Sequence, residues 1–150
     1  MLRKIFTFLS LLVLAISCKE DVTDYGPIDK KIIEDYIAAN SLTAQSTASG
    51  LYYVISKPGG TSHPGIYSNV KANYKGYLTD GTVFDQTTGS PATFPLTGVI
   101  QGWREGLQLI GVNGKIKLLI PSALGYGSQA QADIPANSVL IFDIELIDIY

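Results

Sequence analysis

The 150-residue chain has very little cysteine and histidine, two residue types on which much catalytic chemistry depends. Its one cysteine, Cys18, cannot form an internal disulfide, and its one histidine, His63, lies in a turn-rich segment. A histidine-based triad and a metal site of His and Cys are therefore not expected. A Gly-x-Ser-x-Gly elbow, a phosphate-binding loop and a His-Glu-x-x-His motif are also missing. We accordingly expect neither a metal nor a cofactor.

Charge of either sign is sparse as well. The 11 Lys and Arg residues and the 13 Asp and Glu residues are scattered and form no basic stripe. A surface that binds phosphates needs clustered cations, so nucleic acid is not an expected partner. Asp85, Asp143 and Glu145 could supply a carboxylate pair of the glycosidase kind. Because Asp143 and Glu145 lie two residues apart on one predicted strand, we interpret them as part of a solvated face.

The chain also has no apolar run as long as a membrane span. Arg3 and Lys4 precede the apolar segment 5–16. As a helix, its twelve residues would span about 18 Å, whereas the hydrocarbon core of a bilayer is about 30 Å thick. Together these features predict a signal peptide over residues 1–17.

The signal segment ends in Leu14-Ala15-Ile16-Ser17-Cys18, which resembles a bacterial lipobox. The resemblance implies cleavage before Cys18 and acylation of that residue, so that the protein is exported and lipid-anchored to the bacterial outer membrane. An ordinary secretory signal with an unrelated cysteine is the alternative. Lys19-Glu20-Asp21 is similar to a surface-export signal of some lipoproteins but also suits a plain tether, so the periplasmic and cell-surface faces both stay open.

Residues 18–49 predict a tether and then a helix. Residues 18 to about 26 are polar and aperiodic, whereas Pro27 suits the first turn of a helix that ends near Asn40. One stripe of this helix is apolar: Ile28, Ile32, Ile33, Tyr36 and Ile37. The helix either packs on its own domain, which we favour, or forms a dimer. Residues 41–49, rich in Ser, Thr and Ala, predict a loop.

Residues 50–150 predict one domain made mainly of strands. Segments that are β-rich or alternate in polarity predict strands at 51–55, 70–78, 82–86, 116–120 and 139–150. Asp80-Gly81 predicts a hairpin turn, and the segment 103–110, between two glycines, predicts a helix of two turns. These elements indicate an α+β fold: a half-wrapped antiparallel β-sheet with a short helix on its concave face, preceded by the N-terminal helix.

Aromatic residues recur beside turns and glycines in this domain. They are Tyr74, Phe84, Phe94, Trp103, Tyr126 and Phe142. Such residues usually belong to a core, and their position near irregular segments is no more than a hint of a cleft.

A series of motifs follows in a fixed order along residues 50–150. They are Asn73-Tyr74-Lys75-Gly76-Tyr77-Leu78, Asp80-Gly81-Thr82-Val83-Phe84-Asp85, Phe94-Pro95-Leu96, Val99-Ile100-Gln101-Gly102-Trp103-Arg104-Glu105-Gly106-Leu107, Gly114-Lys115, Ile120-Pro121-Ser122, Leu124-Gly125-Tyr126-Gly127, and the segment from Ile134-Pro135 to Glu145-Leu146. The series resembles the FKBP-type peptidyl-prolyl cis/trans isomerases. One block alone is weak, whereas the ordered set is specific.

The resemblance implies an isomerase that rotates X–Pro bonds of proline-containing polypeptides and assists the folding of exported proteins. It implies that Trp103 is the floor of the pocket, with Tyr74, Phe84 and Phe142 as walls. Asp85 orders the polar side, and the Ile100 N–H and the Tyr126 hydroxyl hold substrate carbonyls. The remaining residues of the implied substrate site are Val99, Phe94 and Ile134. The resemblance also implies binding of the macrolide inhibitors of this family.

The chain departs from the family pattern at Ala92, at a short segment 97–98 and in the loop 128–133. These departures leave two alternatives to the isomerase. One is an FKBP-like chaperone or peptide-binding module with little isomerase activity. The other is a β-rich surface lipoprotein that binds a glycan or a partner protein through an exposed Trp103.

Overall fold

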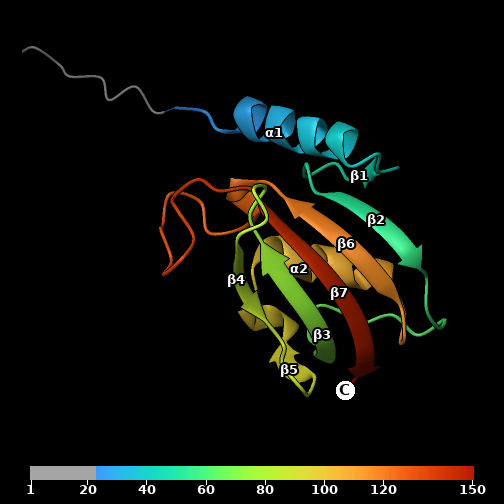
Figure 1. Cartoon of the computed structure of the whole chain (residues 1–150). Helices are drawn as coiled ribbons and strands as arrows, with labels where there is room; N and C mark the ends of the chain where they lie inside the picture. The colour runs from blue at the N-terminus through green and yellow to red at the C-terminus, as the bar shows by residue number, and fades with distance from the viewer. Residues whose placement is uncertain (1–22) are drawn as a thin grey trace, which may run out of the picture.

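The computed structural model describes residues 23–150 (Figure 1). The predicted signal peptide, Cys18 and residues 19–21 lie outside the described residues. The helices are α1 (Gly26–Ala39) and α2 (Gln101–Gly106), and the 3-10 turns are η1 (Leu96–Gly98), η2 (Leu107–Leu109) and η3 (Ser122–Leu124). The strands are β1 (Gln45–Ser46), β2 (Tyr52–Lys57), β3 (Asn69–Tyr77), β4 (Val83–Gln86), β5 (Ala92–Pro95), β6 (Lys115–Ile120) and β7 (Leu140–Ile149). Within residues 23–150, no helix combines the length and apolar character needed to cross a bilayer.

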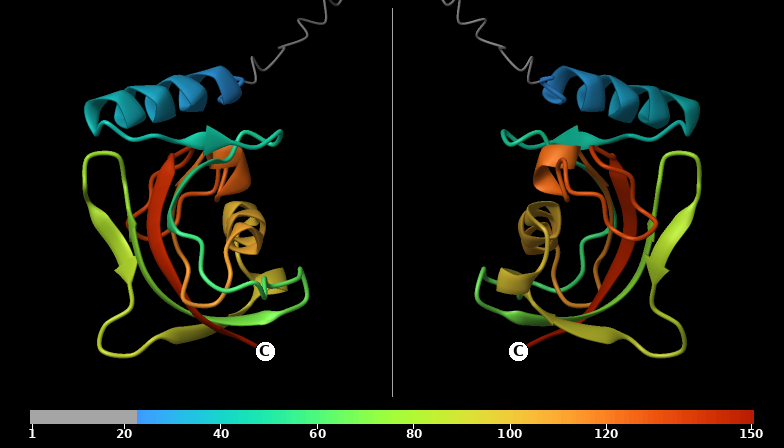
Figure 2. Two further views of the ribbon diagram at one scale, coloured as in Figure 1. Left: turned by 90° about the vertical axis from the view of Figure 1, so that its right-hand side faces the viewer. Right: turned by 90° about the vertical axis from the view of Figure 1, so that its left-hand side faces the viewer.

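The strands form one antiparallel sheet in the order β1-β2-β6-β7-β3-β4, and β5 pairs with the first half of β3. The sheet curves around α2, and α1 lies across one end of it (Figure 2). The predicted α+β fold, with a short helix on the concave face of a half-wrapped sheet and an N-terminal helix before it, is confirmed.

The main core lies between the concave face and α2. Alternation places one face of β7 in this core, as the sequence predicts, while Asp143 on the other face is exposed. Apolar side chains from α2, η2, β6 and β7 dominate it: Trp103, Leu107, Ile116, Leu118, Ile120, Leu140, Phe142, Ile144 and Leu146.

Helix α1 packs on its own domain, but not through the whole predicted stripe. Ile33 is fully buried against Leu119 and Val139 in a small second core. Ile28 and Ile32 are instead 43% and 37% exposed, so their expected burial is wrong. The second buried residue of α1 is Asp29, which is 1% exposed because Ser122 offers its carboxylate two hydrogen bonds.

Three boundaries also differ from the predictions. The expected loop 41–49 contains the two-residue strand β1, and β5 was not predicted because four residues that end in proline give little periodic signal. The helix predicted over 103–110 begins two residues earlier, at Gln101, and its second turn is the 3-10 turn η2.

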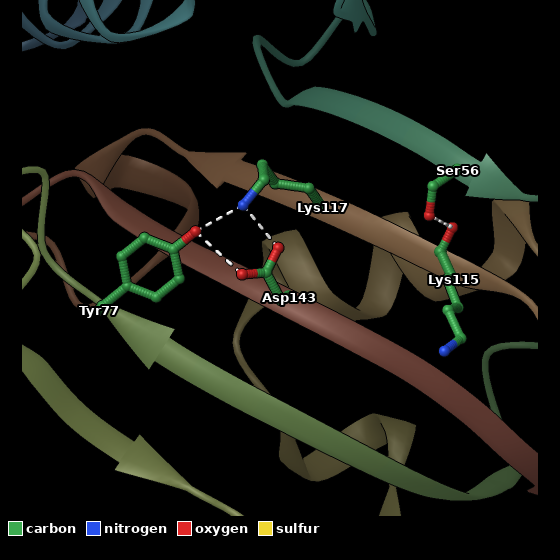
Figure 3. A network of polar contacts seen from close by, with 5 residues as sticks. All are labelled: Ser56, Tyr77, Lys115, Lys117 and Asp143. Carbon is green, nitrogen blue, oxygen red and sulfur yellow. Dashed lines mark hydrogen bonds and ion pairs between the residues drawn. The ribbon is translucent and has the colours of Figure 1, made fainter. Parts of the chain in front are cut away.

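On the face of the sheet turned away from α2, Tyr77, Lys117 and Asp143 form a polar network, in line with the solvated face predicted for Asp143 and Glu145 (Figure 3). Asp143 pairs with Lys117 and accepts a hydrogen bond of 3.0 Å from the Tyr77 hydroxyl. Glu145 pairs with Lys115 at 3.3 Å. Burial and the Asp143 carboxylate raise the pKa of Tyr77 above its ordinary value. Because each carboxylate has a cation beside it, these residues form cross-strand ion pairs and not an acid–base pair.

Candidate active site

A cavity of about 400 Å³ opens beside α2 on the concave side of the sheet. It brings together all ten residues proposed from the sequence for catalysis or substrate binding: Tyr74, Phe84, Asp85, Phe94, Val99, Ile100, Trp103, Tyr126, Ile134 and Phe142. They come from β3, β4, β5, α2, β7 and the loops between these elements. The structure thus places the residues in one site, while the role assigned to each of them stays a prediction.

Trp103 lies at the bottom of this pocket and is 4% exposed. Helix α2 can bring it there because glycine lets the helix approach β6 closely. A Cβ atom at Gly102 would lie 2.6 Å from Cγ2 of Ile120, and one at Gly106 would lie 2.5 Å from Cδ2 of Leu118. The two glycines of the motif therefore set the depth of the tryptophan.

Aromatic rings surround Trp103 at its edges. The ring centroid of Trp103 lies 5.2 Å from that of Tyr74, 5.7 Å from that of Phe94 and 5.3 Å from that of Phe142. All three pairs are near perpendicular, and Phe84 packs edge-on against Phe142 at 5.4 Å. Edge-to-face packing holds rings in fixed orientations, so the apolar lining is preorganised.

The pocket also has a polar side. The Tyr74 hydroxyl donates a hydrogen bond of 2.6 Å to Oδ2 of Asp85. Within residues 23–150, the Ile100 N–H and the Tyr126 hydroxyl have no hydrogen-bond partner, and Tyr126 is 38% exposed. The buried Nε1 of Trp103 likewise has no partner there. The Ile100 N–H and the Tyr126 hydroxyl are thus free to bind the carbonyl oxygens of a ligand.

Burial raises the pKa of the Tyr74 phenol above its ordinary value of about 10, and the hydrogen bond to Asp85 raises it further. Since the folded chain holds this proton more tightly than the unfolded chain, Tyr74 contributes stability that is fully present below the unfolded pKa. The contribution is lost as the pH rises from the unfolded pKa through the folded one. The Tyr74–Asp85 hydrogen bond therefore persists in alkali that ionises an ordinary tyrosine.

We expect the substitution Tyr74→Phe to leave the phenolate absorbance that the folded chain gains between about pH 8 and pH 11 unchanged. The matched control is the chain unfolded in denaturant, in which the same substitution removes the phenolate signal of one tyrosine. A loss of one tyrosine equivalent from the folded chain over this range would contradict the assignment.

Four lining residues were not found from the sequence: Gly98, Gln131, Ala132 and Asp133. The last three belong to the loop before Ile134, which folds back through mutual backbone hydrogen bonds between Gln131 and Ile134 at 2.9 and 2.6 Å. The polar residues of this loop have no periodic pattern. The one available clue was their position beside Ile134.

The chemistry open to this pocket is binding and positioning. Its two carboxylates, Asp85 and Asp133, are exposed, and Asp85 already holds the Tyr74 hydroxyl. Among residues 23–150, no three His, Cys, Asp or Glu side chains gather as a metal site. A rigid ring-lined pocket with free donors at its rim suits a compact apolar ring flanked by carbonyl groups.

Comparison with known proteins gives concordant matches. A family model described as FKBP-type peptidyl-prolyl cis-trans isomerase matches residues 60–147. The chain is 49% identical over 120 residues to the FKBP-type peptidyl-prolyl cis-trans isomerase FkpA of Aeromonas hydrophila, with 77% of this chain and 45% of that protein covered. It is 41% identical over 133 residues to FkpA of Escherichia coli K12, with 87% and 48% covered.

Solved structures agree. The crystal structure of FkpA from Escherichia coli superposes with a TM-score of 0.73 and 42% identity, covering 79% of this chain and 57% of that one. A peptidyl-prolyl cis-trans isomerase from Pseudomonas syringae superposes with a TM-score of 0.71 and 33% identity, covering 85% of this chain and 98% of that one. The chain spans about half the length of the curated relatives it matches.

Proposed function

Because the chain belongs to the family of FKBP-type peptidyl-prolyl cis-trans isomerases, we propose that it catalyses the rotation of X–Pro bonds in exported polypeptides. The observation that carries this proposal is the pocket itself. A buried Trp103 lies among perpendicular aromatic rings, and unpaired donors on Ile100 and Tyr126 stand at the rim. The apolar lining of the pocket suits a pyrrolidine ring.

The barrier that such an enzyme must lower is the loss of amide resonance. An X–Pro amide prefers trans by only about 0.5–1 kcal/mol but rotates through a barrier of about 18–20 kcal/mol. Resonance places negative charge on the carbonyl oxygen, where water stabilises the planar form. In a dry pocket the planar form loses that stabilisation, whereas the twisted form, with less charge separation, loses less.

The residues of the pocket divide this work. The rings of Tyr74, Phe84 and Phe142 exclude water around the prolyl ring, with Trp103 beneath it. The Ile100 N–H and the Tyr126 hydroxyl donate to substrate carbonyls and hold the chain on either side of the bond. No nucleophile takes part, since the bond rotates and none is broken.

A protease-free assay on a peptide with a single X–Pro bond tests this function. We expect the chain to accelerate cis/trans relaxation and a macrolide inhibitor of this family to suppress the acceleration. A chain that binds the peptide without accelerating relaxation is a peptide-binding module or chaperone. If it neither binds nor accelerates, the proposed function is wrong.

The lipobox-like segment supports a second proposal, that the protein is exported and acylated at Cys18 on the bacterial outer membrane. Seven residues lie between Cys18 and the first residue of α1, Gly26, so the two are eight residue steps apart, and an extended chain of that length spans at most about 28 Å. The tether would thus keep the isomerase domain close to the membrane surface.

In cells of the source organism fed a labelled fatty acid, we expect the wild-type chain to incorporate label and partition into detergent. Cys18→Ala should abolish both, because the acylated thiol is gone. Ser62→Ala, in an exposed loop of the folded domain, is a control that should change neither. An unlabelled wild-type chain in the medium would instead support the ordinary secretory signal.

A further inference from the structure

A buried carboxylate joins the N-terminal helix to the segment before the pocket wall. Asp29, on α1, is 1% exposed. Its Oδ2 accepts hydrogen bonds from the backbone N–H of Ser122 at 2.8 Å and from the Ser122 hydroxyl at 2.6 Å. Ser122 is the first residue of η3, and its N–H has no partner within that turn. The carboxylate therefore anchors the start of η3 from a helix 93 residues away in the sequence.

Ser122 in turn holds the backbone on both sides of Tyr126. Its carbonyl oxygen accepts hydrogen bonds from the N–H of Gly125 at 3.0 Å and from the N–H of Gly127 at 2.8 Å. The Gly127 carbonyl then accepts a bond of 2.7 Å from the N–H of Asn137, which closes the loop containing Ile134. The backbone around Tyr126 and this loop are thus both held by Ser122, whose position is fixed by Asp29.

The buried contact between Asp29 and Ser122 has a cost in desolvation free energy. Oδ1 of Asp29 is buried and has no hydrogen-bond partner among residues 23–150. A buried charge with an unpaired oxygen costs desolvation energy, and an apolar pair would often stabilise a domain as well. What an apolar pair cannot do is hold two donors of Ser122 in one orientation. The contact is therefore better explained by positioning than by stability.

We propose that Asp29 is a positioning residue, through which helix α1 sets the orientation of Tyr126 and the affinity of the pocket for proline-containing peptides. The proposal rests on the proposed function for its substrate, but the positioning itself does not. It gives α1 a role in the site although no residue of α1 lines the pocket.

Amide hydrogen exchange tests the positioning without any assay of activity. We expect Asp29→Ala to speed exchange at Gly125 and Gly127 by about tenfold or more, because both amides depend on a fixed Ser122. Asp29→Asn keeps an oxygen acceptor and should restore most of the protection. Asp35→Ala is the matched control, since Asp35 lies on the same helix, is exposed and pairs only with Lys31. Unchanged exchange at both glycines in Asp29→Ala would overturn the proposal. If Asp29→Ala does not fold, the same exchange measurement is made on Ser122→Ala, which removes the hydroxyl that bonds to Asp29.

Peptide affinity tests the second part of the proposal, which is the effect of Asp29 on binding of proline-containing peptides. We expect Asp29→Ala to raise KM for a prolyl peptide about three- to tenfold while kcat changes less than about twofold. In a Tyr126→Phe background the same substitution should add little, since both act through one wall. If Asp29 had a purely structural role, Asp29→Ala would lower Tm and leave KM unchanged, or its effect on KM would add fully to that of Tyr126→Phe. Either result overturns the proposed effect on peptide affinity.

If the wild type proves inactive, quenching of Trp103, the one tryptophan, by the peptide gives the affinities instead. If the wild type does not bind the peptide either, the proposed function has failed and the exchange data alone decide the positioning.

Discussion

Trp103→Ala is expected to lower kcat/KM for a prolyl peptide by about a hundredfold, which corresponds to about 2.7 kcal/mol of transition-state stabilisation. The indole is the floor of the pocket and touches three other rings, so its removal opens the site to water. Water in the pocket would stabilise the planar amide again and remove the advantage of the twisted form. The measurement is kcat/KM in a protease-free peptide assay, at a temperature where the variant is still folded.

The loss of activity has to be separated from a loss of stability, since truncating a buried aromatic residue costs about 3–5 kcal/mol. Leu51→Ala is the matched control, because Leu51 is fully buried in the same core but does not line the pocket. We expect it to destabilise the chain while kcat/KM stays within about threefold of wild type. Trp103→Phe, which keeps a ring, should fall between. Unchanged kcat/KM in Trp103→Ala would show that the reaction takes place elsewhere or not at all.

Gly111→Ala is expected to lower the free energy of unfolding by about 3 kcal/mol or more. A Cβ atom at this position would lie 1.8 Å from the carbonyl oxygen of Gly60, which is backbone and has no flexible end that could turn aside. The two segments are also tied by hydrogen bonds from the Gly111 N–H to Pro58 and from the Gly60 N–H to Val112, at 2.9 and 2.8 Å. Relief of the clash must therefore break the junction between the ends of β2 and β6.

Gly60→Ala provides the control on the facing loop segment, which follows β2. Its Cβ atom would lie 3.6 Å from the carbonyl oxygen of Val112, an ordinary contact, so we expect a change of about 0.5 kcal/mol or less. Urea unfolding of both variants gives the comparison through their midpoints at a common slope. Equal effects of the two substitutions would contradict the close approach at Gly111.

The long strands could be predicted because each has one face in the core. In β3, Val70 and Ala72 are buried and alternate with more exposed residues, and β7 repeats the pattern from Phe142 to Leu146. Strand β5 escaped prediction, since its hydrogen bonds depend on where β3 passes and not on a pattern of its own. The bulge in the β3–β7 pairing between Lys71 and Ala72 left no trace in the sequence either.

The residues of the pocket likewise fall into those that could be predicted from the sequence and those that could not. Its aromatic residues could be proposed because their motifs resemble those of a family, whereas composition and periodicity by themselves indicated only core residues. Gln131, Ala132 and Asp133 reach the pocket through the fold of a loop, and no local pattern marks them. Asp29 was not singled out from the sequence, since a carboxylate is rarely buried without a partner. Its partner, Ser122, lies too far along the chain for any local rule to pair them.

The amino-acid sequence by itself determined the antiparallel strands, the short helix with its flanking glycines and the family to which these motifs belong, because alternation, turn chemistry and motif order act over neighbouring residues. Only the tertiary structure decided the depth of Trp103, the buried contact between Asp29 and Ser122 and the loop wall at 131–133. Each of these depends on atoms that meet after residues far apart in the chain have packed against one another, and packing at that range is set by the whole core and not by any segment.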